Sequence, residues 1–257
     1  MIYFVSIVAG LLFGSFANVC IFRMPQEASI RFPGSYCPFC KKPLRWVDNI
    51  PILSFIALRG RCYRCRNPIS WQYPIVEASL SLMFLMAAWR YPNDRYRLLI
   101  MDLVSFYVLT ISIIDAQHKI IPDELSLSLV GFGWLLSWIN PFLFRHGFYA
   151  SMESVLATIA GGMGMLIFAW AGEKIFKKEA LGGGDIKLLA GFGALLGWRG
   201  LMGPLVIGST LGALFGGGML LLKRIKRSET IPFGPFLCIG AYLSCLYPSW
   251  INLFLSP

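Results

Sequence analysis

The chain has 257 residues, of which 56% are hydrophobic and 14% are charged, and its mean hydropathy is +0.64. A soluble domain carries about 25% charged residues, so this composition excludes an ordinary soluble protein and indicates a membrane protein. The net charge of +10 could suit nucleic acid. No basic module rich in stacking side chains accompanies the charge, so we expect no nucleic-acid partner.

Eight apolar segments follow one another along the chain. They cover residues 2–22, 74–90, 98–114, 125–144, 154–172, 186–199, 202–222 and 233–255. Because about 20 apolar residues span a lipid bilayer, we predict an all-α polytopic membrane protein with about eight transmembrane helices. The second and sixth segments are short, and without the sixth the C-terminus would change sides. The first lacks the charge and cleavage signals of a signal peptide, so we expect a retained span.

The basic residues are unevenly distributed between the loops. If the N-terminus lies outside, the loops facing the cytoplasm hold 18 of the 23 Lys and Arg residues. Arg90, Arg95 and Arg97 are the main exceptions. Cytoplasmic loops carry such a basic excess in membrane proteins. The distribution therefore predicts that both termini lie outside and that the long loop after the first segment is cytoplasmic.

That loop, residues 23–73, is a polar insertion with a metal-binding pattern. It contains Cys37-Pro38-Phe39-Cys40 and Cys62-Tyr63-Arg64-Cys65. Two Cys-x2-Cys pairs at this separation are typical of a zinc ribbon, in which four thiolates close a tetrahedral structural site. Disulfides are the alternative, but thiols stay reduced in the cytoplasm. The remaining cysteines lie in apolar segments, where we expect simple packing: Cys20, Cys238 and Cys245.

Two aspartates lie next to short loops between apolar segments. Asp115 ends the third segment, and Asp185 begins the sixth after Gly182-Gly183-Gly184. The predicted topology places both at the cytoplasmic face, where a charge at the membrane is costly and marks a candidate site. Two carboxylates that meet can share one proton and activate water, as in aspartic proteases. Taken singly, each could instead be a helix cap or an interfacial charge.

Five further polar residues have alternative interpretations. Lys187 either stabilises the Asp185 anion or extends its charge into the cytoplasm. Asp123 is expected to cap the fourth helix, and Glu77 to lie in the first turn of the second, with catalysis as the alternative for Glu77. His118 is expected to be a polar loop residue, with a general base as the alternative. Asp102, within the third segment, must be paired or face a cavity.

Small residues in two segments are expected to serve helix packing, because they let helix backbones approach closely. They are Gly161, Gly162 and Gly164 in the fifth segment, and Gly208, Gly212 and Gly216 in the seventh.

Together these motifs resemble those of the type IV prepilin peptidases, the bifunctional leader peptidases and N-methyltransferases of bacterial pilus and type II secretion systems. The resemblance covers nearly the whole chain. The matching motifs are Gly14-Ser15-Phe16-Ala17-Asn18-Val19, Arg23-Met24-Pro25, both Cys pairs, Pro74-Ile75-Val76-Glu77, Ile114-Asp115, Ile121-Pro122-Asp123, Gly182-Gly183-Gly184-Asp185-Ile186-Lys187 and Pro232-Phe233-Gly234-Pro235-Phe236.

The resemblance implies an intramembrane Gly-x-Gly-Asp aspartic protease of the bacterial inner membrane. Asp115 and Asp185 would be the catalytic pair, supported by Gly182 and Gly184. The substrates would be prepilins or pseudopilins, cut after the glycine that ends the leader. The new N-terminal residue would then be methylated from S-adenosylmethionine. Methyl transfer is associated with the first cytoplasmic region, where Gly60 matches a motif glycine linked to that activity.

We therefore expect three parts: a first helix at 1–22, a zinc-binding insertion at 23–73 and a membrane-embedded peptidase at 74–257. Two other function classes compete. A proton-coupled transporter also uses membrane aspartates, but it predicts inverted repeats and an Asp pair near mid-membrane, and the sequence indicates neither. A membrane scaffold with a zinc-ribbon docking module would leave the paired aspartates unexplained. The client protein and the oligomeric state stay open.

Overall fold

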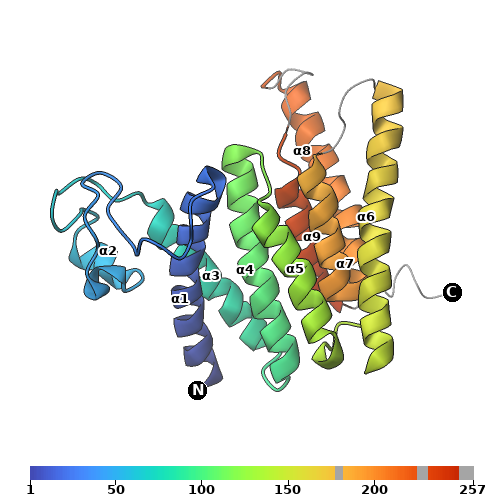
Figure 1. Ribbon diagram of the computed structural model, residues 1–257, viewed down its shortest axis with the longest axis horizontal. Helices are drawn as coiled ribbons and strands as arrows, with labels where there is room; N and C mark the ends of the chain where they lie inside the picture. The colour runs from blue at the N-terminus through green and yellow to red at the C-terminus, as the bar shows by residue number, and fades with distance from the viewer. Residues whose placement is uncertain (177–181, 225–230, 249–257) are drawn as a thin grey trace. The chain divides into compact units, whose positions relative to one another are not determined.

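The structure is a computed structural model that describes residues 1–176, 182–224 and 231–248. It divides into two compact units, Met1–Leu98 and Leu99–Pro257. Helices dominate the described residues, which confirms the predicted all-α class. The helices labelled in Figure 1 are α1 (Ile2–Arg23), α2 (Leu53–Ala57), α3 (Gln72–Arg90), α4 (Arg95–His118), α5 (Asp123–Leu136), α6 (Phe148–Phe176), α7 (Gly183–Gly203), α8 (Ser209–Leu221) and α9 (Gly234–Leu246).

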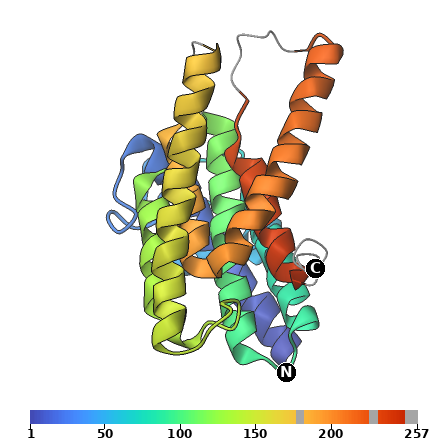
Figure 2. The same cartoon turned by 90° about the vertical axis from the view of Figure 1, so that its right-hand side faces the viewer.

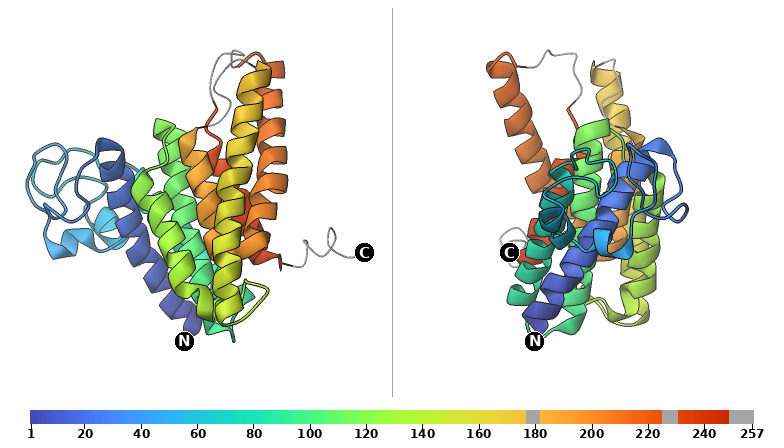
Figure 3. Two further views of the ribbon diagram at one scale, coloured as in Figure 1. Left: turned by 45° about the vertical axis from the view of Figure 1, so that its right-hand side comes forward. Right: turned by 90° about the vertical axis from the view of Figure 1, so that its left-hand side faces the viewer.

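In the first unit, α1 and α3 pack side by side, and the chain between them forms a small lobe (Figure 3). Glycines allow this close approach. A Cβ at Gly10 would lie 2.5 Å from the Cα of Ser81, and a Cβ at Gly14 would lie 2.6 Å from the Cα of Glu77. Because any side chain there would meet backbone, α1 is held in one register against α3.

Helix α7 lies at the centre of the second unit, where it contacts α5, α6 and α9. It buries large side chains on several faces, which is typical of a helix enclosed by its neighbours: Leu188, Leu189, Phe192, Leu195 and Leu196. Figure 2 shows α8 diverging from α6 on the outside of this unit. The helix that begins beside Asp185 is therefore held from several sides.

Four helical stretches of the described residues are long and apolar enough to cross a membrane. They are Ile2–Gln26, Arg95–His118, Phe148–Lys174 and Gly200–Leu221. The chain is therefore a multi-pass membrane protein by helix length and composition. Each of the eight predicted segments contains a helix. Eight spans remain a prediction, because the other helices are shorter or less apolar.

The fourth predicted segment is longer than the helix that forms. We expected it to reach residue 144, but α5 ends at Leu136 and one 3-10 turn follows at Ser137–Ile139. Helical backbone angles are disfavoured at Asn140 because the next residue is a proline. The Asn140 side chain instead donates a hydrogen bond to the Leu195 carbonyl of α7. A polar loop thus closes this end of the second unit.

The predicted boundary between the sixth and seventh segments is wrong. We expected a break between residues 199 and 202, but α7 continues through a π-helical turn at Pro204–Gly208 into α8. The interruption lies earlier, at Gly197, where φ is 62° and ψ is −150°. Glycine adopts such angles because it has no Cβ. The eighth predicted segment is helical to Leu246, and residues 249–255 lie outside the described part of the chain.

The close backbone approach expected at the packing glycines is confirmed for two of them. A Cβ at Gly161 would meet the Leu189 carbonyl of α7, and one at Gly208 would meet the backbone of α9 at Phe236. Gly212 and Gly216 face side chains from the region of α9, and Gly162 makes only an ordinary contact with the Ala190 side chain. A Cβ at Gly164 would meet nothing within 4 Å, so its packing role was predicted wrongly.

Candidate functional site

Asp115 lies in the last turn of α4 and is 5% exposed. Its Oδ2 accepts a hydrogen bond of 2.9 Å from the backbone N–H of Gly234, the first residue of α9. A Cβ at position 234 would lie 2.7 Å from the same oxygen. Only glycine therefore lets this N–H reach the carboxylate. The motif Pro232–Phe236 thus positions Asp115, a role that the sequence alone did not reveal.

Asp185 is the third residue of α7, near the helix N-terminus, where aligned peptide dipoles favour negative charge. Its N–H donates to the Gly182 carbonyl at 3.1 Å. Gly184 packs against the loop that follows α4, because a Cβ there would lie 2.9 Å from the Cβ of Ile121. A Cβ at Gly183 would meet nothing within 4 Å. Within the glycine run, Gly184 is thus the residue that brings α7 close to the α4–α5 loop.

The two predicted aspartates come together in the second unit. Ile121 lies between them: its side chain faces Gly184 before one aspartate and Gly234 beside the other. Asp185 interacts electrostatically with Asp115, so the two carboxylates lie in one neighbourhood. Carboxylates that approach closely do not both ionise easily, which is the property that the predicted pair requires.

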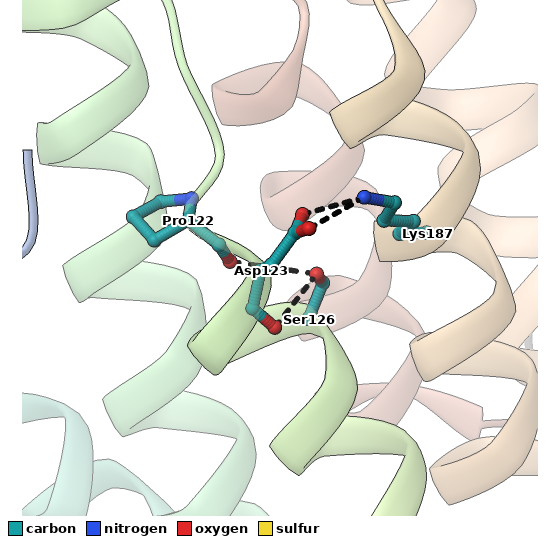
Figure 4. A network of polar contacts seen from close by, with 4 residues as sticks. All are labelled: Pro122, Asp123, Ser126 and Lys187. Atoms are coloured by element: carbon teal, nitrogen blue, oxygen red, sulfur yellow. Dashed lines mark hydrogen bonds and ion pairs between the residues drawn. The ribbon is translucent and has the colours of Figure 1, made fainter. Parts of the chain in front are cut away.

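An ion pair next to the aspartates joins α5 to α7 (Figure 4). Lys187 Nζ contacts Asp123 Oδ1 at 2.6 Å and Oδ2 at 2.7 Å. Asp123 is the first residue of α5 and makes no capping hydrogen bond, so the predicted cap is wrong. Pro122 occupies the cap position, and its fixed φ starts the helix. Lys187 neutralises Asp123 and ties the loop after Asp115 to the helix of Asp185.

We expect Lys187→Ala and Asp123→Ala each to lower unfolding stability by no more than about 1 kcal/mol, because both partners are solvent-exposed. In a double-mutant cycle, the coupling energy from thermal unfolding should also stay below about 1 kcal/mol. The exchanged pair Asp123→Lys with Lys187→Asp should recover the stability of the parent protein. A coupling energy well above about 2 kcal/mol would show that the pair is buried in the functional protein.

The remaining polar candidates have other roles. Glu77 lies in the second turn of α3, not the first, because the helix already begins at Gln72. It is buried, and its Oε2 accepts a hydrogen bond of 2.7 Å from the Ile52 N–H, so it anchors the insertion.

His118 is the exposed last residue of α4 and not part of a loop. Asp102 lies near Tyr242 of α9, and its Oδ1 has no partner among the described residues.

The four cysteines of the insertion form a cluster. Their sulfur atoms all lie within 4.8 Å of one another, and those of Cys37 and Cys65 are 3.8 Å apart. Thiolates around a tetrahedral zinc ion, with Zn–S distances of about 2.3 Å, are separated by about 3.8 Å. All seven cysteines of the chain are free thiols, and Cys20, Cys238 and Cys245 are buried as predicted. The cluster therefore fits a metal ion, which could be held by four thiolates.

Both Cys pairs have the same local structure. The N–H of Cys37 donates to the Lys42 carbonyl at 3.0 Å, and the N–H of Cys62 donates to the Asn67 carbonyl at 2.8 Å. Backbone N–H groups of the second knuckle, first that of Cys65, lower the pKa of the Cys62 thiol to about 7. Donors of this kind favour the thiolate that a metal requires.

Gly60 has a clear backbone role in the insertion. Its φ is +67°, in the left-handed region that favours glycine, and its N–H donates to the Phe55 carbonyl at 2.8 Å. Its carbonyl in turn accepts from the Ile69 N–H at 2.8 Å. Gly60 therefore closes the turn that follows α2, after the left-handed Arg59, and directs the chain into the second Cys pair. The described contacts give it no direct chemical role.

The fold and the site define a class: an all-helical membrane protein in which two aspartates from different helices share one neighbourhood, with a four-cysteine module in a polar insertion. The family model "Bacterial Peptidase A24 N-terminal domain" matches residues 8–91, and "Type IV leader peptidase family" matches residues 103–217. The chain belongs to this peptidase A24 family of type IV leader peptidases.

Relatives in several bacteria carry the name prepilin leader peptidase/N-methyltransferase. The protein of Stutzerimonas stutzeri is 34% identical, over 96% of this chain and 91% of the relative. That of Aeromonas hydrophila is 33% identical, over 92% of this chain and 88% of the relative. That of Myxococcus xanthus is 36% identical, over 97% of this chain and 75% of the relative. No solved structure matches the chain.

Proposed function

We propose that this protein cuts the leader peptide from prepilins or pseudopilins and methylates the new N-terminal residue. The observation that supports the proposal is that Asp115 and Asp185 lie near each other around Ile121, with the Gly234 N–H on one of them, in a chain whose relatives bear that name. A scaffold would not need paired carboxylates, and a transporter does not account for the name that the relatives carry.

Leader cleavage would use both carboxylates in one hydrolytic step. The ionised aspartate takes a proton from water, and the water oxygen attacks the scissile carbonyl carbon. The protonated aspartate donates a hydrogen bond to the carbonyl oxygen as negative charge develops there. When the C–N bond breaks, the leaving nitrogen receives the proton that the first aspartate took from water, which returns both aspartates to their starting states. No covalent acyl-enzyme forms, because neither aspartate acts as the nucleophile.

The substrate would bind as an extended strand, because a helix hides its carbonyls in hydrogen bonds. The glycines around Asp185 favour such an approach, and Gly183 has open space beside it. We propose eight spans with both termini outside and with the aspartates at the cytoplasmic face of the inner membrane. The basic excess of the loops supports this orientation. A leader on the cytoplasmic side of a single-span precursor would then reach the site.

The insertion at 23–73 would hold one zinc ion through Cys37, Cys40, Cys62 and Cys65. Four thiolates leave no open position, so the metal would stabilise the fold of the insertion. A segment of this size has too few buried apolar side chains to fold firmly without such support. We propose that the ordered insertion, shaped at Gly60, serves methyl transfer from S-adenosylmethionine.

One experiment tests the whole proposal. The purified protein is incubated with a prepilin, with and without S-adenosylmethionine, and the masses of the products are measured by mass spectrometry. We expect loss of the leader in both reactions and a further mass of one methylene group on the mature chain only when the methyl donor is present. An uncut precursor would favour the transporter or the scaffold.

The zinc site predicts a defined metal content. The purified protein should contain about one zinc ion per chain, and Cys37→Ser or Cys62→Ser should lose most of it, because three thiolates hold zinc far less tightly. Metal analysis by mass spectrometry gives the content directly. Cys20→Ala is the matched control, since Cys20 is a buried thiol of the same unit outside the cluster. Zinc-free parent protein with full activity would contradict the site.

A further inference from the structure

A groove of about 480 Å³ opens on the second unit between α6, the loop before it and α7. It is lined by Arg145 and Glu153 and by apolar side chains that include Tyr149, Leu156 and Trp198. At about 1.5 Å per residue, Trp198 at the α7 end of the groove lies roughly 20 Å along the helix from Asp185. The groove is therefore separate from the paired aspartates.

Glu153 is the unusual feature of this groove. It is 6% exposed, and its Oε2 accepts a hydrogen bond of 2.9 Å from the Phe144 N–H. Its Oε1 is buried and has no hydrogen-bond partner among the described residues. Buried carboxylate oxygens are normally satisfied, so the site is built to receive a donor.

The backbone of α7 is shaped around this oxygen. A Cβ at Gly197 would lie 2.6 Å from Glu153 Oε1, and Gly197 is the left-handed residue that interrupts the helix. An alanine there would be strained by its φ and would press on the carboxylate. The kink therefore makes room for Glu153 at the place where the groove meets α7.

The second charged group of the groove has the opposite sign. Arg145 is exposed, and its guanidinium lies 5.7 Å from the ring centroid of Tyr149. Arginine offers several N–H donors and no acceptor, which suits a phosphate. The groove thus has the buried Glu153 carboxylate in its wall, with one oxygen lacking a donor, and donors for a phosphate at its rim.

An apolar surface continues from the groove along α6. Exposed side chains follow at helical spacing, so they share one face of the helix: Tyr149, Met152, Leu156, Ile159 and Met163. The candidate span Phe148–Lys174 is only 17% buried within the structure, and Figure 1 shows α6 at the edge of the second unit. Aromatic residues at the start of such a span are typical of the membrane interface.

We propose that this groove binds the headgroup of a phospholipid with a primary amine, of the phosphoethanolamine type. Because Oε1 has no exposed surface in the empty groove, the Glu153 carboxylate turns toward the groove on binding and pairs with the ammonium. The phosphate accepts from Arg145, and an acyl chain lies along the exposed face of α6. A choline headgroup fits poorly, because its nitrogen carries no N–H. An anionic headgroup without an amine leaves the carboxylate unsatisfied and adds a negative charge beside it.

The test compares lipids that differ only in N-methylation. The detergent-purified protein is mixed with phosphatidylethanolamine, its dimethylated form or phosphatidylcholine of identical acyl chains, and bound lipid is counted by native mass spectrometry. We expect retention to fall with each loss of N–H, by about tenfold overall, as for a charge-assisted hydrogen bond. Equal retention of the three lipids by the parent protein overturns the proposal without any variant. Preferential retention of phosphatidylglycerol does so too.

Variants then assign the contacts. Glu153→Gln should reduce the preference for the amine over choline to less than about twofold, because a neutral amide binds ammonium weakly. Arg145→Gln should lower retention of both lipids alike. Glu173→Gln, an exposed change on the same helix, is the matched control and should keep the preference. Unchanged preference in Glu153→Gln, with thermal unfolding like that of the parent, overturns the assignment.

A soluble headgroup distinguishes a membrane lipid from a free metabolite. Glycerophosphoethanolamine has the same charged groups but no acyl chains. In large excess it should not displace the bound lipid, because the contacts along α6 are missing. Displacement at equal concentration would overturn the lipid as the occupant.

Discussion

Asp115→Asn and Asp185→Asn should each lower leader cleavage by about 10²–10⁴-fold or more, which is the usual contribution of a general acid or base. An amide cannot take up a proton from water, and it cannot share one with the partner carboxyl. In Asp115→Asn the amide oxygen could still accept the hydrogen bond from the Gly234 N–H, so the protein should fold. Cleavage rates of a purified prepilin, followed by mass spectrometry, check this result.

A second substrate provides the control for folding. A pilin that already has its mature N-terminus needs no cleavage, so both variants should still methylate it from S-adenosylmethionine. Near-normal cleavage by either variant would refute the aspartate pair. Loss of both activities together would indicate a misfolded variant. Thermal unfolding of the same samples shows whether that is so.

Gly234→Ala should cost about 10²-fold in cleavage although it removes no chemical group, because small misplacements of reacting groups have effects of this size. The new Cβ would lie 2.7 Å from Asp115 Oδ2 and must displace the carboxylate or the start of α9. Gly184→Ala should act in the same direction through Ile121, which would lie 2.9 Å from the new Cβ.

Gly183→Ala is the matched control for both changes. Gly183 is the first residue of α7, just as Gly234 is the first residue of α9, and a Cβ there would meet nothing within 4 Å. Alanine favours the helix by up to about 1 kcal/mol, so the control should unfold no earlier than the parent protein. If all three alanine variants cleave equally well, the close contacts around the aspartates do not matter for catalysis.

The apolar segments illustrate how far the sequence predicts this fold. Each one contains a helix, because membrane composition is a property of neighbouring residues. The positions at which the helices end or are interrupted were less predictable. Gly197, not the stretch near residue 200, interrupts α7, and Asn140 ends the helical region after α5 early. The proline after Asn140 is a local signal for one of these ends. The interruption at Gly197 lies against Glu153 of α6, and no local pattern contains that contact.

The candidate site shows the same division. The sequence by itself determined the membrane class, the two Cys pairs and the two aspartates, because charges in an apolar chain and closely spaced thiols stand out locally. Tertiary structure alone decided that the Gly234 N–H holds Asp115, that Lys187 pairs with Asp123, and that Glu153 lies against the kink of α7. Such contacts join residues far apart in the chain, and their energy exists only after the helices have packed.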